Sequence, residues 1–171
     1  MGKAEIVKDY AKAAGCPADC ISVKQLYVLE DNKKLRECRR HVNTAEEKDV
    51  DRIYDFLMRI PQLRNMYGQK QMISNRIVSG EGEHIFLTED GEIVAHANSA
   101  ASTKWSCMIG GVGTAPLWRH RGLGHEIVSV LAGRALQKGQ TPVLFSEKEE
   151  EENLFCDLGF HRIGQWGVLK I

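Results

Sequence analysis

The stretch Gly111-Val112-Gly113-Thr114-Ala115-Pro116-Leu117-Trp118-Arg119-His120-Arg121-Gly122-Leu123-Gly124 decides how this chain is interpreted. A glycine-rich strand predicted over 104–114 ends in it, a proline turn follows, and a loop opens into a helix predicted over 123–138. Backbone N–H groups in the first turn of a helix lack intrahelical acceptors and carry partial positive charge. The glycines at 122 and 124 let an anion approach that backbone without a Cβ in the way. The stretch therefore predicts a phosphate or pyrophosphate site.

Other phosphate-binding patterns do not fit this loop. No Gly-Lys-Ser/Thr follows it, which excludes a Walker loop. Only two of its glycines fall in the register of the dinucleotide fingerprint Gly-x-Gly-x-x-Gly. The remaining alternative is a helix amino terminus whose glycines serve packing alone. Arg119 and Arg121 favour the anion site, because guanidinium groups bind phosphate oxygens.

The segments around the loop follow the order β-α-α-β-β-β-α-β-α-β from residue 42. A capping box at 44–47 predicts the first helix, which carries an apolar stripe and ends at Pro61. The next predicted segments are a helix over 68–79 and strands over 84–88 and 93–97, joined by a hairpin turn at 89–92. After the loop helix come a strand at 143–145, a helix at 149–158 and one or two strands within 160–171. This order predicts an α+β fold with a mixed sheet.

Residues 1–41 are expected to form an amino-terminal extension, with a helix over 3–14 and a strand over 25–30. The extension is interpreted as a remnant of a second lobe, a sheet extension or a dimer contact. It also holds residue types that suit tetrahedral zinc: Cys16, Cys20, Cys38 and His41. Because nothing else in this region resembles a zinc ribbon, we interpret these as unrelated side chains and expect no metal.

The composition narrows the classes of partner. The chain has 171 residues, enough for one domain, with 23 basic and 23 acidic side chains. That balance predicts no nucleic-acid partner and no attraction to a membrane surface. No apolar run approaches the ~20 residues that cross a bilayer, and no signal peptide is recognisable. Five irregularly spaced cysteines are typical of reduced thiols, so the expected location is cytoplasmic, with a homodimer possible.

Two motifs resemble the GNAT superfamily of N-acetyltransferases. The first is Pro116-x-x-Arg119-x-Arg121-Gly122-x-Gly124, similar to that family's acetyl-CoA turn. The second is Asn153-Leu154-Phe155-Cys156-Asp157-Leu158-Gly159-Phe160, similar to the family's Leu-Tyr-x-x-x-Gly-Phe. The resemblance covers residues 42–171 and implies a mixed, mostly antiparallel sheet flanked by helices and splayed at the acyl-CoA site.

The resemblance also implies an activity and a binding site. The co-substrate would be acetyl-CoA, and the acetyl group would pass directly to an amine of a small molecule or peptide. The implied pyrophosphate-binding residues are Arg119, His120, Arg121, Gly122, Leu123 and Gly124. The implied pantetheine-binding strand is Val112, Gly113 and Thr114, with a main-chain N–H near 112 polarising the thioester carbonyl.

The sequence departs from the family at the residues that move protons. Phe155 stands where the family often has a tyrosine that protonates the leaving thiolate. The strand over 104–114 has Ser106 and Cys107 where many members carry a basic carboxylate. The remaining candidates for a catalytic role are Glu147, Ser146 and His96.

Each catalytic candidate has a structural alternative. Glu147 belongs to an acidic run, 147–152, that is also typical of a solvated helix start. His96 is also interpretable as a structural histidine. Cys107 could form an acyl-cysteine intermediate, and the alternative is that it is a buried and inert thiol.

The departures leave a second class of function open, a catalytically silent module that binds acyl-CoA as a sensor. The acceptor is not specified by any pattern in the chain. Arg64, Asn65, Tyr67 and Lys70 are the side chains that could line its pocket or simply solvate a helix.

Overall fold

A computed structural model describes residues 1–147 and 149–170, apart from the side chains at 18 and 149–151. Its eight strands form one sheet in the order β1-β8-β2-β7-β6-β5-β4-β3. The strands are β1 (Gly2–Lys3), β2 (Ile21–Val28), β3 (Val42–Thr44), β4 (His84–Glu89), β5 (Glu92–Ser102), β6 (Ser106–Thr114), β7 (Thr141–Ser146) and β8 (His161–Leu169). Only β6 and β7 are parallel, and every other neighbouring pair is antiparallel. The predicted mixed, mostly antiparallel α+β sheet is confirmed.

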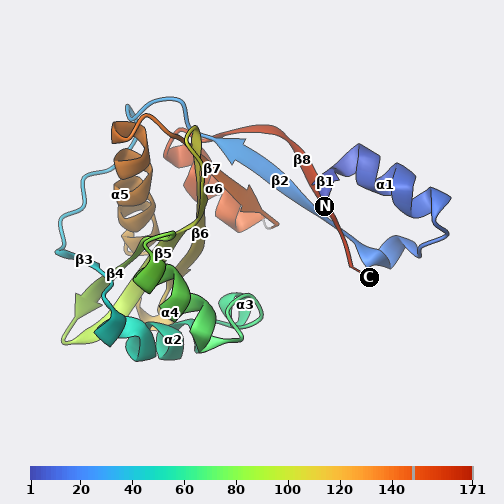
Figure 1. Cartoon of the computed structure of the whole chain (residues 1–171). Coiled ribbons are helices and arrows are strands. Elements are labelled where there is room, and N and C mark those ends of the chain that lie inside the picture. Colours follow the sequence, from blue (N-terminus) through green and yellow to red (C-terminus); the bar gives the residue numbers. More distant parts are fainter. Residues whose placement is uncertain (148, 171) are drawn as a thin grey trace.

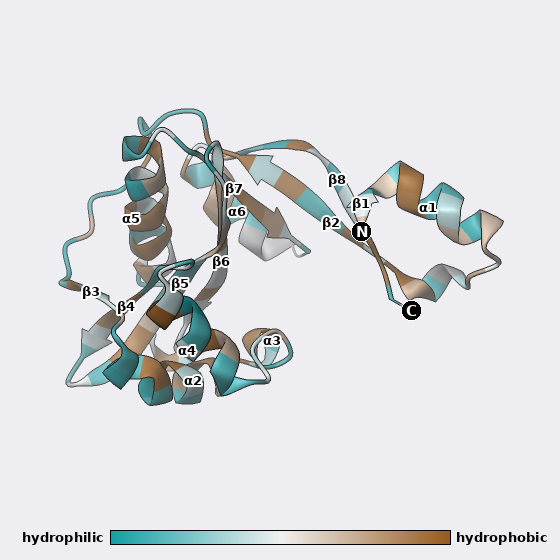
Figure 2. Cartoon of the chain, in the orientation of Figure 1, coloured by the Kyte–Doolittle hydropathy of each residue, from teal (hydrophilic) through white to brown (hydrophobic). Residues whose placement is uncertain are grey.

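Helices cover both faces of this sheet (Figure 1). One layer holds α5 (Leu123–Gln137) and α6 (Glu149–Asp157), and the other holds α2 (Val50–Met58), α3 (Pro61–Arg64) and α4 (Lys70–Ser79). Side chains on β4 alternate between the layers, as a strand requires. Ile85 and Leu87 join the core under α5, whereas Phe86 joins the core under α2 and α4. Figure 2 shows the same division, with hydrophobic residues along α5 and the strands.

The predicted 89–92 hairpin turn is present between β4 and β5. Asp90 and Gly91 both have positive φ, at 49° and 81°. A two-residue hairpin turn of type I′ requires positive φ at both central residues, and Asp-Gly adopts these values at low cost. The sequence signal and the backbone therefore agree here.

The start and end of the first predicted helix were wrong. The capping box joins Glu46 and Asp49, not residues 44 and 47, and a short 3-10 turn (Glu47–Asp49) precedes α2. Pro61 does not end the helix but begins α3, where its missing N–H costs nothing. Residues 46, 47 and 49 all carry carboxylates, so the sequence allowed the capping box to be placed at more than one position.

The amino-terminal residues take part in the sheet. Strand β2 lies between β7 and β8, and its Tyr27 is buried in the core with Leu29. Helix α1 (Ala4–Ala13), β1 and the outer ends of β2 and β8 project away from the rest of the fold (Figure 1). Residues 29–41 then run along α5, with Arg36 N donating to Ser129 Oγ at 3.0 Å. The division of the chain at residue 41 remains a prediction.

Candidate functional site

Strands β6 and β7 separate at the predicted acyl-CoA site. Their parallel pairing ends at Met108 and Val143, although β6 continues to Thr114 and β7 to Ser146. On its other side β6 pairs with β5 up to Thr114, with a bulge in which residues 111 and 112 stand opposite residue 97. The edge of β6 over 109–114 that faces β7 therefore offers backbone N–H and C=O groups that an extended ligand can pair with. Val112 and Thr114 on that edge are half-buried.

Helix α5 begins directly beyond this edge with its first N–H groups unsatisfied. The first intrahelical bond is from Glu126 N to Gly122 O, at 3.0 Å, and no side chain caps the helix. The N–H groups of Leu123, Gly124 and His125 therefore lack helical acceptors. Together they form a set of backbone donors suited to an anion.

The two glycines of the loop are required for different reasons. Gly122 caps α5 with φ of 82°, a left-handed conformation, and a Cβ there would meet open space. At Gly124 a Cβ would lie 2.8 Å from Leu154 Cδ1 of α6, so glycine permits the close packing of the two helices. Gly113 has a comparable packing role, since a Cβ there would lie 2.7 Å from both Ile60 and Leu63.

Three cationic or polar side chains surround the uncapped helix end. Arg119, His120 and Arg121 are all exposed, and none of them forms an ion pair within residues 1–147 and 149–170. Arg121 stacks over the Trp118 ring, with its Cζ 4.7 Å from the ring centroid. Residues implied by the resemblance for pyrophosphate binding thus lie together around one helix terminus.

Glu126, in the first turn of α5, forms an ion pair with Arg40 from the amino-terminal region. Arg40 contacts both carboxylate oxygens of Glu126, at 3.0 and 3.1 Å, and its Nε contacts Glu89 at 2.9 Å. The bond with Glu89, more than those with Glu126, raises the pKa of Arg40. Sequence reasoning missed this residue because its partners lie 49 and 86 positions away.

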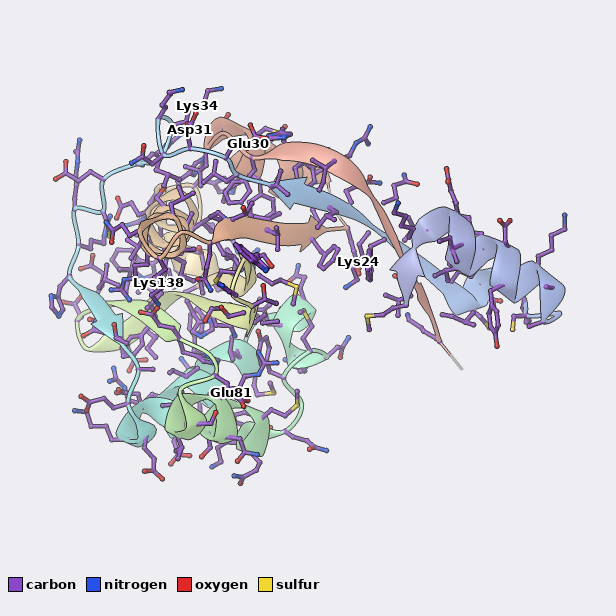
Figure 3. All side chains as sticks on the ribbon, turned by 45° about the horizontal axis from the view of Figure 1, so that its top comes forward. Lys24, Glu30, Asp31, Lys34, Glu81 and Lys138 are labelled. Atoms are coloured by element: carbon purple, nitrogen blue, oxygen red, sulfur yellow. The ribbon has the colours of Figure 1, made fainter. Side chains whose placement is uncertain are left out.

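Ser146 and Glu147 lie at the end of β7, on the opposite side of the splay from Val112. Ser146 is buried at 1% exposure. The Glu147 side chain is 53% exposed and forms an ion pair with Lys24 Nζ on β2, at 2.8 Å. Figure 3 shows Lys24 on the part of β2 between the projecting α1 end and the body of the sheet. Within the predicted acidic run 147–152, residue 148 and the side chains at 149–151 lie outside the part of the chain that the structure describes.

His96 is completely buried beneath the α2–α4 layer. Its Nδ1 lies 2.8 Å from Gly111 O and its Nε2 lies 3.0 Å from His84 Nδ1. Burial lowers the pKa of His96 to about 4 and that of His84 to about 3. Both imidazoles are therefore neutral at physiological pH, and neither reaches solvent.

Asn98 and Tyr67 extend this buried polar cluster. Asn98 Nδ2 donates to Tyr67 Oη at 2.7 Å, and burial raises the pKa of Tyr67. Gly111 has φ of 58°, and a Cβ there would lie 2.7 Å from Tyr67 Oη. Among the described residues, His84 Nε2 and Asn98 Oδ1 are buried without a hydrogen-bond partner. Such a buried unpaired acceptor typically costs about 1–3 kcal/mol.

Phe155 and Cys107, two positions at which the chain departs from the family, are both buried. Phe155 is 5% exposed and packs between Tyr27 and Phe160, with centroid distances of 6.4 and 6.1 Å. The Tyr27 hydroxyl hydrogen-bonds Glu152, and burial is the largest cause of its raised pKa. Cys107 is buried, and burial raises its pKa, so the thiol is poorly suited to nucleophilic attack.

The cysteines and histidine of the amino-terminal region do not form a cluster. Within residues 1–147 and 149–170, no group of three or more His, Cys, Asp or Glu side chains is arranged to hold a metal ion. Cys38 instead contacts Arg40 O and Glu126 Oε2, both at 3.5 Å. In the same described part of the chain, no helix combines the length and apolar character needed to span a membrane.

Several solved structures share this fold. An acetyltransferase of the GNAT family from Colwellia psychrerythraea superposes with a TM-score of 0.67 at 16% identity, covering 85% of this chain and 54% of that one. A predicted acetyltransferase from Clostridium acetobutylicum, solved with acetyl-CoA, gives 0.58 at 15% identity over 71% of this chain and 89% of that one. An acetyltransferase from Trypanosoma brucei gives 0.64 at 19% identity over 77% and 99%.

Three further structural neighbours are longer, and the chain spans 62%, 68% and 65% of their lengths. No curated protein matches the chain significantly. The family model described as acetyltransferase (GNAT) family matches residues 49–160, which include the β6–α5 loop and α6. The splayed sheet beside an uncapped helix agrees with this match. Because the family model covers residues 49–160, the chain belongs to the GNAT acetyltransferase family.

Proposed function

We propose that this chain transfers an acyl group, in the first place acetyl, from a coenzyme A thioester to an amine of a small molecule or peptide. The observation that carries the proposal is the placement of the free β6 edge next to the uncapped amino terminus of α5. The edge suits the extended pantetheine arm, and the helix terminus suits the pyrophosphate. Arg119 and Arg121 would contribute charge to the phosphates.

The residues fit this co-substrate by a geometric criterion. Nothing lies within 4 Å of the position that a Cβ on Gly122 would take, so the space beside the loop backbone is open to an anion. The Val112 N–H is the candidate donor for the thioester carbonyl oxygen, because it lies on the free edge one residue after the Gly111 kink.

The chemistry requires a neutral amine. An alkylamine with a pKa of about 10.4 needs roughly 4–5 kcal/mol to deprotonate at neutral pH. In the transfer, the nitrogen lone pair forms a C–N bond, the C–S bond breaks and its electron pair leaves on sulfur. The proton that the nitrogen loses balances the one that coenzyme A thiolate gains. Glu147 is an exposed carboxylate at the splay and our candidate for accepting that proton first.

A second candidate function is a catalytically silent acyl-CoA-binding module. Phe155 favours it, because this side chain has no proton to donate and packs in an apolar cluster. The complete burial of His96 also favours the silent module.

Thiol release separates the two functions. The protein is incubated with acetyl-CoA and a panel of primary amines, and free coenzyme A is measured with a thiol reagent. Amine-dependent release supports the transferase. Tight binding of acetyl-CoA without release from any amine would favour the silent module.

A further inference from the structure

The buried cluster of His84, His96, Asn98 and Tyr67 has a defined direction of hydrogen bonding. The Gly111 carbonyl only accepts, so His96 Nδ1 must carry the proton that it shares with that oxygen, at 2.8 Å. His96 is neutral, so its Nε2 is a lone pair and accepts from His84 Nδ1–H at 3.0 Å. His84 Nε2 is then an acceptor as well.

Asn98 supplies a second acceptor of the same kind. Its Nδ2 donates to Tyr67 Oη, which leaves Oδ1 as an acceptor. Asn98 and His84 are paired across β5 and β4, so their side chains lie on the same face of the sheet. Within the described residues, both acceptor atoms are buried and lack a partner. Two buried lone pairs on neighbouring side chains call for a ligand group with two N–H or O–H donors.

The charges near the cluster select against a cation. Burial raises the pKa of Tyr67 and lowers that of His84, and the positive charge of Arg76 on α4 acts on both groups, opposing the rise at Tyr67 and adding to the fall at His84. Among the residues that the structure describes, no carboxylate is a cause of the pKa shifts of Tyr67, His84 or His96. A protonated amine placed here would lose its hydration shell and meet a positive charge. A neutral donor avoids both costs.

The cluster adjoins the strand that would hold the thioester. A Cβ on Gly111 would lie 3.0 Å from Asn98 Nδ2, and one on Gly110 would lie 3.4 Å from Asn98 Oδ1. Val112, on the free edge of β6, is the next residue along the strand. Tyr67 is buried and lies on the short connection between α3 and α4, beside the exposed Met66.

We propose that His84 Nε2 and Asn98 Oδ1 receive the amino group of the acceptor, and that the acceptor is a primary amine that is neutral at physiological pH, such as an arylamine. A neutral primary amine has two N–H donors for these two atoms and keeps its lone pair free to attack. An ammonium has three N–H donors and no lone pair. This assignment rests on the proposed transferase function and specifies its substrate class.

The test compares two amines of similar size in the full chain loaded with coenzyme A. Aniline is neutral at physiological pH and benzylamine is protonated, and calorimetry measures the binding of each. We expect aniline to bind the wild type more tightly than benzylamine by about tenfold or more. The Asn98→Asp variant places a carboxylate in the cluster and should reverse the preference.

Two further variants complete the design. Asn98→Leu removes the acceptor and should weaken aniline about tenfold while leaving coenzyme A affinity unchanged. It decides the question if Asn98→Asp does not fold. Asn75→Leu, on the exposed face of α4, is the matched control and should change neither affinity.

The outcomes separate this inference from the proposed function. Coenzyme A binding with no binding of aniline, or with tighter binding of benzylamine, overturns the inference alone. An unchanged preference in the Asn98 variants does the same and indicates that the cluster holds an internal water only. Failure of the folded wild type to bind coenzyme A overturns both the proposed function and the inference.

Discussion

Lys24 on β2 and Glu147 at the end of β7 form an ion pair, with Nζ and Oε1 2.8 Å apart. The pair connects the amino-terminal region to the edge of the splay, where the acyl group would react. Its two side chains are 30% and 53% exposed. An exposed pair of this kind contributes only about 0–1 kcal/mol to stability. Its significance is that it holds a carboxylate beside the proposed site of acyl transfer.

Glu147→Gln tests that carboxylate as the proton acceptor. We expect kcat for amine acetylation to fall about 10²-fold, with the Kd for acetyl-CoA unchanged, because the amide cannot take the amine proton. Steady-state kinetics and calorimetry measure the two quantities. Glu92→Gln, on the exposed start of β5, is the control. An unchanged kcat in Glu147→Gln would remove this residue from the mechanism.

Gly111→Ala tests the kink that precedes Val112. Alanine at φ of 58° is strained, and its Cβ would lie 2.7 Å from Tyr67 Oη, which must then move away from Asn98. We expect the free energy of unfolding to fall by about 2–3 kcal/mol, measured by urea denaturation. Gly164→Ala on β8 is the matched control, since a Cβ there meets nothing within 4 Å. Equal stability of the two variants would show that the kink tolerates a side chain.

Stability should fall on acidification because of His84 and His96. Burial lowers their pKa values to about 3 and about 4, so below pH ~6.5 the unfolded chain binds protons that the folded chain does not. The contribution of the neutral pair is therefore complete above pH ~6.5 and is lost as the pH falls toward 4. Each histidine removes up to about 1.4 kcal/mol per pH unit, the limit reached well between its unfolded and folded pKa values.

Urea denaturation at several pH values between ~6.5 and ~5 measures this slope. His84→Gln should have a shallower slope than the wild type, because one of the two titrating groups is gone. His161→Gln is the control, since this histidine is exposed on β8 and should leave the slope unchanged. A wild-type slope that is flat in this range would contradict the assigned protonation states.

The sequence was sufficient to predict the features that depend on local backbone chemistry. The Asp90-Gly91 turn and the Gly122 cap are each specified by residues that tolerate positive φ. The position of β6 before α5 followed from a strand pattern, a proline turn and a glycine loop. The resemblance to the GNAT family rested on those same residues, and the family match confirmed it.

The unpredicted features are those that depend on long-range pairing. Nothing local in β2 indicates that it lies between β7 and β8, because a strand's neighbours are chosen by the whole sheet. Lys24 and Arg40 acquire their roles only through partners far along the chain. His84 is separated from His96 by a hairpin, and a period-of-two alternation on both strands was the available signal that they share a face.

The most direct test of the account is calorimetric titration of acetyl-CoA into the wild type, Gly122→Glu and Gly139→Glu. Both glycines have positive φ, at 82° and 72°, both adjoin an end of α5, and a Cβ at either meets open space. Backbone strain is therefore matched, and only Gly122→Glu places a carboxylate at the proposed pyrophosphate site. We expect micromolar binding by the wild type and Gly139→Glu and none by Gly122→Glu. Equal binding by the two variants, or no binding by the folded wild type, would contradict it.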